Sequence, residues 1–351
     1  MSEMVLMKGN EALSEAAIMC NCRHYFGYPI TPQNEIAEYM AKRMPEVGGL
    51  CLQAESEIAA INMALGASSA GARVMTSSSS PGVSLKGEGI SYMVGSDLPC
   101  VIINVQRGGP GLGGIQPAQS DYYQATKAMG HGDMRLIVLA PNSIQEMVEL
   151  TALAFDLADL YRMPVMILAD GALGQMMEPV DLGKIKAPAE VDKPWAAVGH
   201  GDKREPNIIN SLYLVPEDLE KTVIDRYKDK YGPIDQKEVK YEEIDAEDAD
   251  VVIVSYGITS RIAKPAYKKL KENGIKAGYF RPVTLSPFPS ARLGEIANTA
   301  KRFFVSELNM GQMVGDVKLA AGCKKPVDFF GHTGGVISTS EEIYDAVIKV
   351  L

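Results

Sequence analysis

The chain has 351 residues, 46% of them hydrophobic and 23% charged, so it can bury a large core, and its length favours two domains. Lys and Arg number 35 against 44 Asp and Glu, and this net charge of −9 argues against a nucleic-acid binder and fits a soluble cytoplasmic protein. No apolar run is long enough for a membrane helix, the start does not resemble a secretory signal, and five scattered cysteines favour neither a disulfide framework nor a ferredoxin-type cluster.

The first half of the chain alternates short apolar runs with helical patterns. The apolar runs predict strands at 74–76, 100–105, 136–140 and 164–169. The clearest helical patterns cover 57–71 and 144–161. Strands that alternate with helices are typical of βαβ units, in which a parallel sheet is covered on both faces. Residues 1–181 are therefore expected to form an α/β domain.

Residues 182–249 differ in composition, being rich in Lys, Asp, Glu and Pro and containing the only tryptophan, Trp195. We expect a connector with one charged peripheral helix in VPEDLEKTVIDRYKDKY. The α/β pattern restarts at 250, with strands expected in VVIVSYG, KAGYF, KRFFVSE and VDFFGH. Helices are expected at 259–273, from about Gln312, and at the end of the chain with Ser340 as cap. Residues 250–351 are thus expected to form a second, smaller doubly wound domain.

The first candidate site segment is YPITP, which runs from Tyr28 to Pro32. Prolines on both sides of Ile-Thr keep the backbone out of the helical region and favour an extended turn. A helix is expected to begin near Pro32, with Thr31 at its N-cap. On the pattern alone, a capped helix start explains these residues without a functional role.

The second segment, QAESEIAA, places Glu57 at the start of a helix crowded with small residues. The helix dipole stabilises a carboxylate at that position, although an ordinary first-turn glutamate explains the pattern as well. The loop 77–82, SSSSPG, follows a predicted strand, and loops in this position contact ligands in parallel α/β sheets.

The third segment is QRGGPGLGGIQPAQSD, in which five glycines within 108–114 form a loop that can approach a ligand or move. Arg107 stands at the end of the preceding strand and could pair with a ligand carboxylate, but a salt bridge to an internal acid is an equal alternative. The lone His131 is more simply structural than catalytic. The scattered histidines predict no metal site, and the GDG…N motif that holds a magnesium–diphosphate is absent.

Taken together, YPITP, QAESEIAA, SSSSPG and QRGGPG, with RPVTLSPFP and SELNMGQM further along, resemble a known family in its order over nearly the whole chain. They resemble the alpha chain of the 2-oxoacid:ferredoxin oxidoreductases, which use thiamine diphosphate. The stretch QRGGPGLGGIQPAQSDYYQAT is most similar to the branched-chain members that act on 2-oxoisovalerate. The resemblance implies a pyrimidine-type N-terminal domain and a transketolase C-terminal-type second domain.

The resemblance also implies roles for single residues. Glu57 corresponds to the glutamate that activates the aminopyrimidine of the cofactor, and Arg107 to the arginine that meets the substrate carboxylate. Thr31 corresponds to a hydroxyl that contacts the substrate. Pro29 and Ser79 are expected to contact the cofactor. The glycine-rich loop after Arg107 is expected from its composition to close over the substrate.

Since the diphosphate motif is missing, the resemblance implies a cofactor shared with a partner beta chain that holds the diphosphate and Mg. The 4Fe-4S clusters are expected on partner chains, which include gamma and ferredoxin-like delta chains. The implied reaction is oxidative decarboxylation of a 2-oxoacid with coenzyme A to acyl-CoA, CO2 and reduced ferredoxin. The segment LGGIQPA lacks a cation for a second carboxylate and favours 2-oxoisovalerate. The alternatives are a 2-oxoglutarate or pyruvate enzyme of this family and a non-catalytic scaffold subunit.

Overall fold

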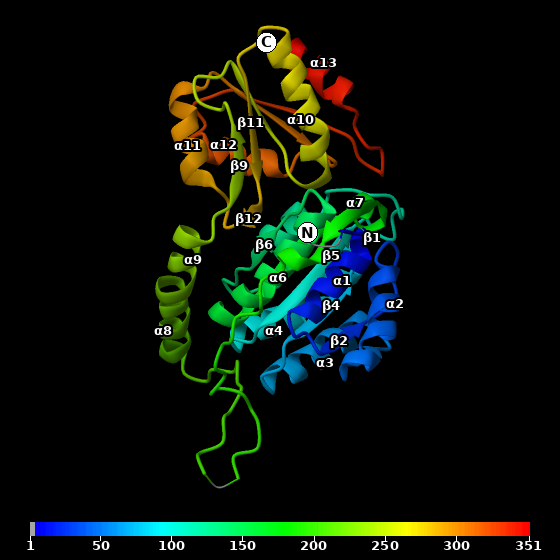
Figure 1. The fold of residues 1–351 in the computed structure, drawn as a ribbon. Coiled ribbons are helices and arrows are strands. Elements are labelled where there is room, and N and C mark those ends of the chain that lie inside the picture. The colour runs from blue at the N-terminus through cyan, green and yellow to red at the C-terminus, as the bar shows by residue number, and fades with distance from the viewer. Residues whose placement is uncertain (1–3, 202) are drawn as a thin grey trace.

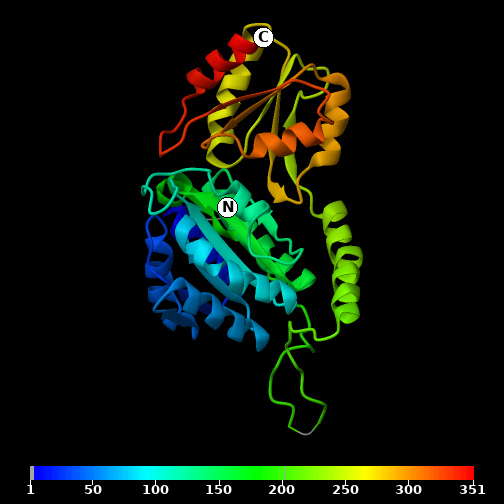
Figure 2. The same ribbon diagram turned by 180° about the vertical axis from the view of Figure 1, so that it is seen from behind.

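The computed structural model describes residues 4–201 and 203–351, which form two large sheets flanked by helices (Figures 1 and 2). The larger sheet contains β2 (His24–Gly27), β3 (Leu50–Gln53), β4 (Val74–Ser78), β5 (Cys100–Gln106), β6 (Ile137–Leu139), β7 (Pro164–Asp170) and β12 (Thr284–Ser286). Their order across the sheet is β12-β6-β7-β5-β4-β2-β3, and only β12 runs antiparallel to its neighbour. A largely parallel sheet with helices on both faces confirms the expected α/β fold.

The helices of this first part are α1 (Gly9–Met19), α2 (Asn34–Arg43), α3 (Glu57–Ser69), α4 (Ser80–Gly95), α5 (Tyr122–Thr126), α6 (Ile144–Tyr161) and α7 (Gly171–Gln175). Side chains of the fully buried β5 alternate between two cores. Val101 and Ile103 pack in one core with α1, α2 and α6, and Ile102 packs in the other with α3 and α4. The period of two along the strand places the two helical layers on opposite faces.

The smaller sheet contains β9 (Tyr241–Ile244), β10 (Val251–Val254), β11 (Ala277–Pro282), β13 (Phe303–Glu307) and β14 (Val327–Gly331). Its order is β14-β13-β10-β11-β9, parallel except for β9. The helices α10 (Gly257–Glu272) and α13 (Ser340–Val350) share one core with it. The other face packs with α11 (Ser290–Thr299) and α12 (Met313–Ala320).

Several details differ from the expectations. A two-stranded antiparallel sheet of β1 (Met4–Lys8) and β8 (Met177–Asp181) was not predicted, nor were β2, β3 and β12. The cap of the last helix is Thr339, not Ser340, because the Thr339 hydroxyl accepts a hydrogen bond from the Glu342 amide and Glu342 bonds back in a capping box.

The segment 182–249 contains the predicted charged helix, α8 (Pro216–Arg226), which continues through a π-helical turn (Tyr227–Tyr231) into α9 (Gly232–Lys237). Figure 1 shows the loop before α8 extending away from both sheets, with α8 and α9 beside them. The next element, β9, pairs with β11, so the second sheet begins before residue 250. No helix among the described residues is long and apolar enough to cross a membrane.

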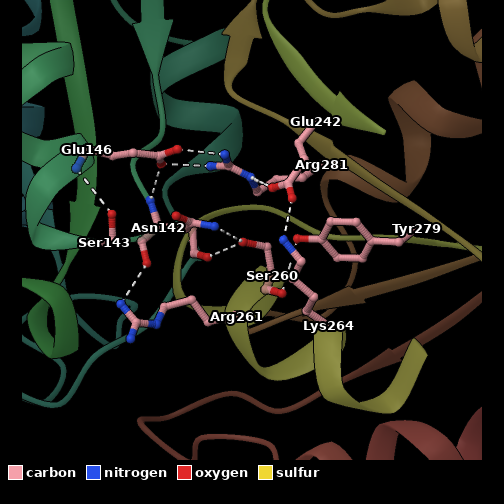
Figure 3. A network of polar contacts seen from close by, with 10 residues as sticks. Asn142, Ser143, Glu146, Glu242, Ser260, Arg261, Lys264, Tyr279 and Arg281 are labelled. Atoms are coloured by element: carbon pink, nitrogen blue, oxygen red, sulfur yellow. Dashed lines mark hydrogen bonds and ion pairs between the residues drawn. The ribbon is translucent and has the colours of Figure 1, made fainter. Parts of the chain in front are cut away.

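An ion-pair network around the buried Arg281 links helix α6, which covers the first sheet, to strands β9 and β11 of the second sheet (Figure 3). Arg281 of β11 donates two hydrogen bonds to the carboxylate of Glu146 on α6, at 2.8 and 2.7 Å, and a third to Glu242 of β9 at 3.0 Å. Its guanidinium is buried, and the bidentate geometry fixes the orientation of α6 relative to β9 and β11.

A second link lies at Gln119, a buried residue in the segment after the glycine-rich loop. Its side-chain amide donates to the Tyr256 carbonyl oxygen at 2.8 Å and accepts from the Thr259 hydroxyl and the Leu308 amide at 2.6 and 3.0 Å. Its main-chain oxygen accepts from Asn309 at 2.7 Å. The C-terminal part of the chain therefore holds the end of the loop that follows Arg107.

Candidate functional site

The candidate residues gather at the carboxyl ends of three adjacent parallel strands. The YPITP turn follows β2 and Arg107 follows β5. The expected loop 77–82 is not a loop, because β4 ends at Ser78 and α4 begins at Ser80. Strands β5, β4 and β2 are neighbours in the sheet. Ligands of parallel α/β sheets bind in the crevice outside these strand ends. Three segments that are distant in the sequence thus meet where a ligand site is expected.

Arg107 and Thr31 are in direct contact. The Nη1 atom of Arg107 donates to the main-chain oxygen of Thr31 at 2.9 Å, and Nη2 donates to that of Leu112 at 3.0 Å. The buried Nε has no hydrogen-bond partner in the described part of the chain. Within the same residues Arg107 forms no ion pair, which removes the alternative of a salt bridge to an internal acid. The hydrogen bonds of its guanidinium therefore reach only neutral oxygens, although its charge also acts on the Asp121 carboxylate and lowers the pKa of that group against the effect of burial.

The expectation that Thr31 caps a helix starting at Pro32 is wrong. Helix α2 begins at Asn34, because Gln33 at the cap position has non-helical torsions (φ −103°, ψ 9°). The Thr31 hydroxyl accepts a bond from the Asn34 side chain at 3.3 Å. Gln33 donates to the Tyr28 oxygen at 3.1 Å and accepts from the Ser77 hydroxyl, so the turn is tied to the end of β4.

Glu57 is the first residue of α3, as the sequence predicts, and Ser56 caps this helix by accepting a bond from the Ala59 amide at 3.2 Å. The Glu57 side chain is buried, with 6% of the residue exposed. Among the described residues its carboxylate has no hydrogen-bond or ion-pair partner. A buried carboxylate without such partners is costly in the free chain and is suited to a donor supplied from outside.

The wall beside Glu57 is formed by Gly82 of α4. A Cβ atom on this glycine would lie 2.4 Å from Oε1 of Glu57 and 2.1 Å from Oγ of Ser78. A side chain at this point would displace the Glu57 carboxylate and the Ser78 hydroxyl. The hydroxyls of Ser78 and Ser79 are buried and have no hydrogen-bond partner within the described residues.

Ser80 and Asp121, which were not predicted as site residues, brace the same region. Ser80 starts α4 with φ +26°, a strained value for a residue with a side chain. Its hydroxyl donates to Asp121 at 2.6 Å and accepts from the Arg107 amide at 3.0 Å, and its own amide donates to Asn104 at 3.2 Å. Burial raises the pKa of Asp121. The single polar residue in VIINV, Asn104, was the available signal for this cluster.

A cleft of about 580 Å³ opens next to this region between α4, the glycine-rich loop and the C-terminal part of the chain. Its wall includes Ser80, Gly109, Asp121, Asn309 and Thr333. The arrangement gives a ligand simultaneous access to the start of α4 and to the loop after Arg107.

The other candidates are less closely tied to the site. Pro29 is exposed on the turn after β2. His131 is exposed on a surface loop, where Ser91 donates to its main-chain oxygen. The described residues contain no group of three or more His, Cys, Asp or Glu side chains placed to hold a metal ion.

The chain is similar to known proteins over nearly its whole length. Residues 15–248 match the sequence model of pyruvate flavodoxin/ferredoxin oxidoreductase, thiamine-diphosphate-binding, and residues 249–343 match that of pyruvate:ferredoxin oxidoreductase core domain II. The ketoisovalerate oxidoreductase subunit VorB of Methanothermobacter marburgensis is 48% identical, over 98% of this chain and 97% of the relative. The 2-oxoglutarate synthase subunit KorA of Methanothermobacter thermautotrophicus is 35% identical over the full length of both chains.

Among solved structures, the fold matches the 2-oxoglutarate:ferredoxin oxidoreductase from Magnetococcus marinus with 2-oxoglutarate, coenzyme A and succinyl-CoA bound. The TM-score is 0.87 at 28% sequence identity, over 99% of this chain and 65% of the solved chain. The present chain therefore spans about two thirds of that solved chain. The chain belongs to the 2-oxoacid:ferredoxin oxidoreductase family.

Proposed function

We propose that this chain is the alpha subunit of a thiamine-diphosphate-dependent 2-oxoacid:ferredoxin oxidoreductase and forms the aminopyrimidine side of its active site. The reaction is the oxidative decarboxylation of a 2-oxoacid with coenzyme A to acyl-CoA, CO2 and reduced ferredoxin. The observation that carries the proposal is the Glu57 side chain beside Gly82, which is 6% exposed and has no hydrogen-bond or ion-pair partner among the described residues.

The residues present fit the cofactor's aminopyrimidine. The ring needs an acidic partner for one nitrogen and a close wall without side chains, and Glu57 and Gly82 provide these two features. The unsatisfied hydroxyl of Ser79 adds a polar group for the cofactor, and Pro29 lies on the turn after the neighbouring strand. Bound thiamine diphosphate supplies an electron sink for cleavage next to a carbonyl group.

The chain's own residues then have separate tasks. Glu57 holds a proton between its carboxylate and the ring nitrogen, which orients the pyrimidine. Arg107 binds the substrate carboxylate, and a bidentate pair requires its Nη2 to exchange the Leu112 oxygen for the substrate. The Thr31 hydroxyl donates near the carbonyl of the substrate. The glycine-rich loop that carries Leu112 moves in this exchange and excludes water from the site.

The rest of the active site is assigned to partner chains. A beta chain supplies the diphosphate and Mg site, and 4Fe-4S clusters on the partner chains, which include gamma and ferredoxin-like delta chains, carry electrons to ferredoxin. This assignment rests on the absence of a GDG…N motif and of a cluster-type cysteine run in the sequence. In this proposal, residues 1–181 act as the pyrimidine domain, 182–249 as a connector and 250–351 as the transketolase C-terminal-type domain, except that β9 of the connector joins the second sheet and β12 joins the first.

The preferred substrate is 2-oxoisovalerate. The loop segment after Arg107 presents Leu112 and Ile115 with large exposed surfaces, and 108–118 contains no lysine or further arginine. An aliphatic side chain suits this segment better than the second carboxylate of 2-oxoglutarate. The higher identity to a ketoisovalerate oxidoreductase subunit than to a 2-oxoglutarate synthase subunit supports the same choice.

The test is dye reduction by the complex purified through this chain, with thiamine diphosphate, Mg, coenzyme A and each of three 2-oxoacids. Fastest reduction with 2-oxoisovalerate supports the whole proposal. Preference for pyruvate or 2-oxoglutarate retains the reaction and rejects the substrate. An intact complex that reduces the dye with none of them is the result expected of a non-catalytic scaffold subunit.

A further inference from the structure

We propose that Lys86 is a positioning residue for Glu57: its buried ammonium group balances and orients the carboxylate that faces the aminopyrimidine. The inference rests on the proposed function, because it concerns the same carboxylate. Lys86 lies outside every motif that drew attention in the sequence, and no role in the reaction described above uses it.

The placement of Lys86 follows from α4. Lys86 is four residues after Gly82, so both residues lie on the same face of the helix, and Gly82 is the residue that abuts Glu57. Lys86 is fully buried, with 0% of the residue exposed. Its Nζ atom donates to the Thr76 hydroxyl and, at 3.0 Å, to the Ser77 main-chain oxygen, both at the end of β4.

The charge balance around this ammonium is incomplete without Glu57. Lys86 forms no ion pair within 4.0 Å in the described part of the chain, and its two acceptors are neutral. A buried charge with only neutral partners is unfavourable, so a nearby anion is required for it to remain charged. Glu57 is such an anion, and it interacts electrostatically with Lys86.

The neighbouring thiol does not replace Glu57 in this role. Burial lowers the pKa of Lys86 to about 8, and electrostatic interactions with Cys100, when that thiol is ionised, and with Glu57 oppose this shift. Burial also raises the pKa of Cys100 to about 12, so this thiol is uncharged at neutral pH. Of the two groups that oppose the shift, Glu57 therefore remains as the counter-charge that favours the charged form of Lys86.

A purely architectural role for Lys86, in which it ties α4 to β4, makes different predictions. In that case, the hydrogen bonds of Lys86 support the fold and its positive charge has no effect on the site. Lys86→Gln keeps N–H donors for Thr76 and Ser77 without the charge, whereas Lys86→Met removes both. An uncharged side chain of similar length also removes a desolvation cost, so the fold is expected to tolerate Lys86→Met.

The experiment compares wild type, Lys86→Met and Lys86→Gln in the assembled complex, each also combined with Glu57→Gln. Three quantities are measured: the melting temperature, calorimetric affinity for thiamine diphosphate in the cofactor-free complex, and the near-ultraviolet circular dichroism of the bound aminopyrimidine. Turnover is followed by dye reduction. We expect both single variants to melt no lower than wild type, to lose at least tenfold in turnover, and to change the dichroism signal.

The combination with Glu57→Gln separates the two roles. If Lys86 acts through Glu57, replacing it has less than a twofold effect on cofactor affinity once Glu57 is already glutamine. Wild-type turnover and dichroism in Lys86→Gln would overturn the proposal, as would an equal loss of affinity with and without Glu57→Gln. A wild-type complex that binds no thiamine diphosphate would overturn the proposed function as well, so the two failures are distinguishable.

Discussion

Gly82 and Glu57 approach so closely that a methyl group on Gly82 would lie 2.4 Å from Oε1 of Glu57. These residues stand at the first turns of α4 and α3, two helices that pack on the same face of the sheet. The glycine in α4 therefore determines where the carboxylate of α3 can lie. Glu57 can occupy its position only because residue 82 has no side chain.

Gly82→Ala is therefore expected to reduce turnover at least tenfold and to weaken thiamine diphosphate binding, because the new methyl displaces the Glu57 carboxylate. Gly87→Ala in the same helix is the matched control, since the nearest atom to a Cβ there is 3.8 Å away. The control should retain activity and gain up to about 1 kcal/mol of stability from helix propensity. Equal turnover in the two variants would contradict the role of the contact.

Glu57→Gln in the assembled complex is expected to lose most turnover while the complex stays intact, because the amide cannot exchange a proton with the ring nitrogen in the same way. Glu55→Gln is the control, as Glu55 is exposed just before α3 and bonds only to the neighbouring Ser56 side chain. Steady-state dye reduction and size-exclusion chromatography provide the two readouts. Wild-type turnover in Glu57→Gln would remove Glu57 from the reaction.

Arg281→Met is expected to lower the free energy of unfolding by about 3 kcal/mol, because it removes the buried guanidinium that pairs with two carboxylates, only one of which keeps another cationic partner, Lys264. Those carboxylates belong to Glu146 and Glu242. Urea unfolding of the purified chain measures the effect. Lys221→Met is the control, because its ion pair with Asp225 lies on the surface of α8, and it should leave the unfolding midpoint unchanged.

Asp170 gives a pH dependence with a defined sign. Burial raises its pKa from 3.8 to about 6, so the folded chain binds this proton more tightly than the unfolded chain. Its contribution to stability is fully present below pH 3.8 and is lost as the pH rises through 6. Between pH 4 and pH 7 the wild type should lose roughly 2–3 kcal/mol relative to Asp170→Asn. Urea unfolding of both proteins across this range tests the prediction, and parallel pH profiles would refute it.

Much of the architecture could be predicted from local patterns. The long amphipathic or apolar segments, such as α6, α10 and β5, lie where their periodicity indicates. The strands that escaped prediction are short and depend on partners elsewhere in the sequence. The clearest case is β12, three residues long, whose partner β6 lies about 145 positions earlier. No short stretch of the sequence indicates which distant strand β12 will pair with.

The residues of the candidate site also divide into those that local sequence patterns indicate and those that depend on tertiary packing. Glu57 and Arg107 stand at the ends of regular elements, where ligands are expected, but their pattern alone allowed structural explanations, and their proposed roles come from the family resemblance. Lys86 could not, since a lysine in LKGEG reads as a surface residue. Only the helical spacing of Gly82, Lys86 and Gly89 indicates that it faces inward, and the extent of burial depends on tertiary packing.

The pairing of β12 with β6 has a consequence for the order in which this protein can be made. The first sheet lacks its final edge strand until the ribosome has synthesised Ser286, long after the seven-stranded sheet's other members have emerged. Until then, β6 exposes an unpaired edge, which is a template for association with other nascent chains. A fragment ending before β12 should aggregate during expression even if it contains every residue assigned to the cofactor.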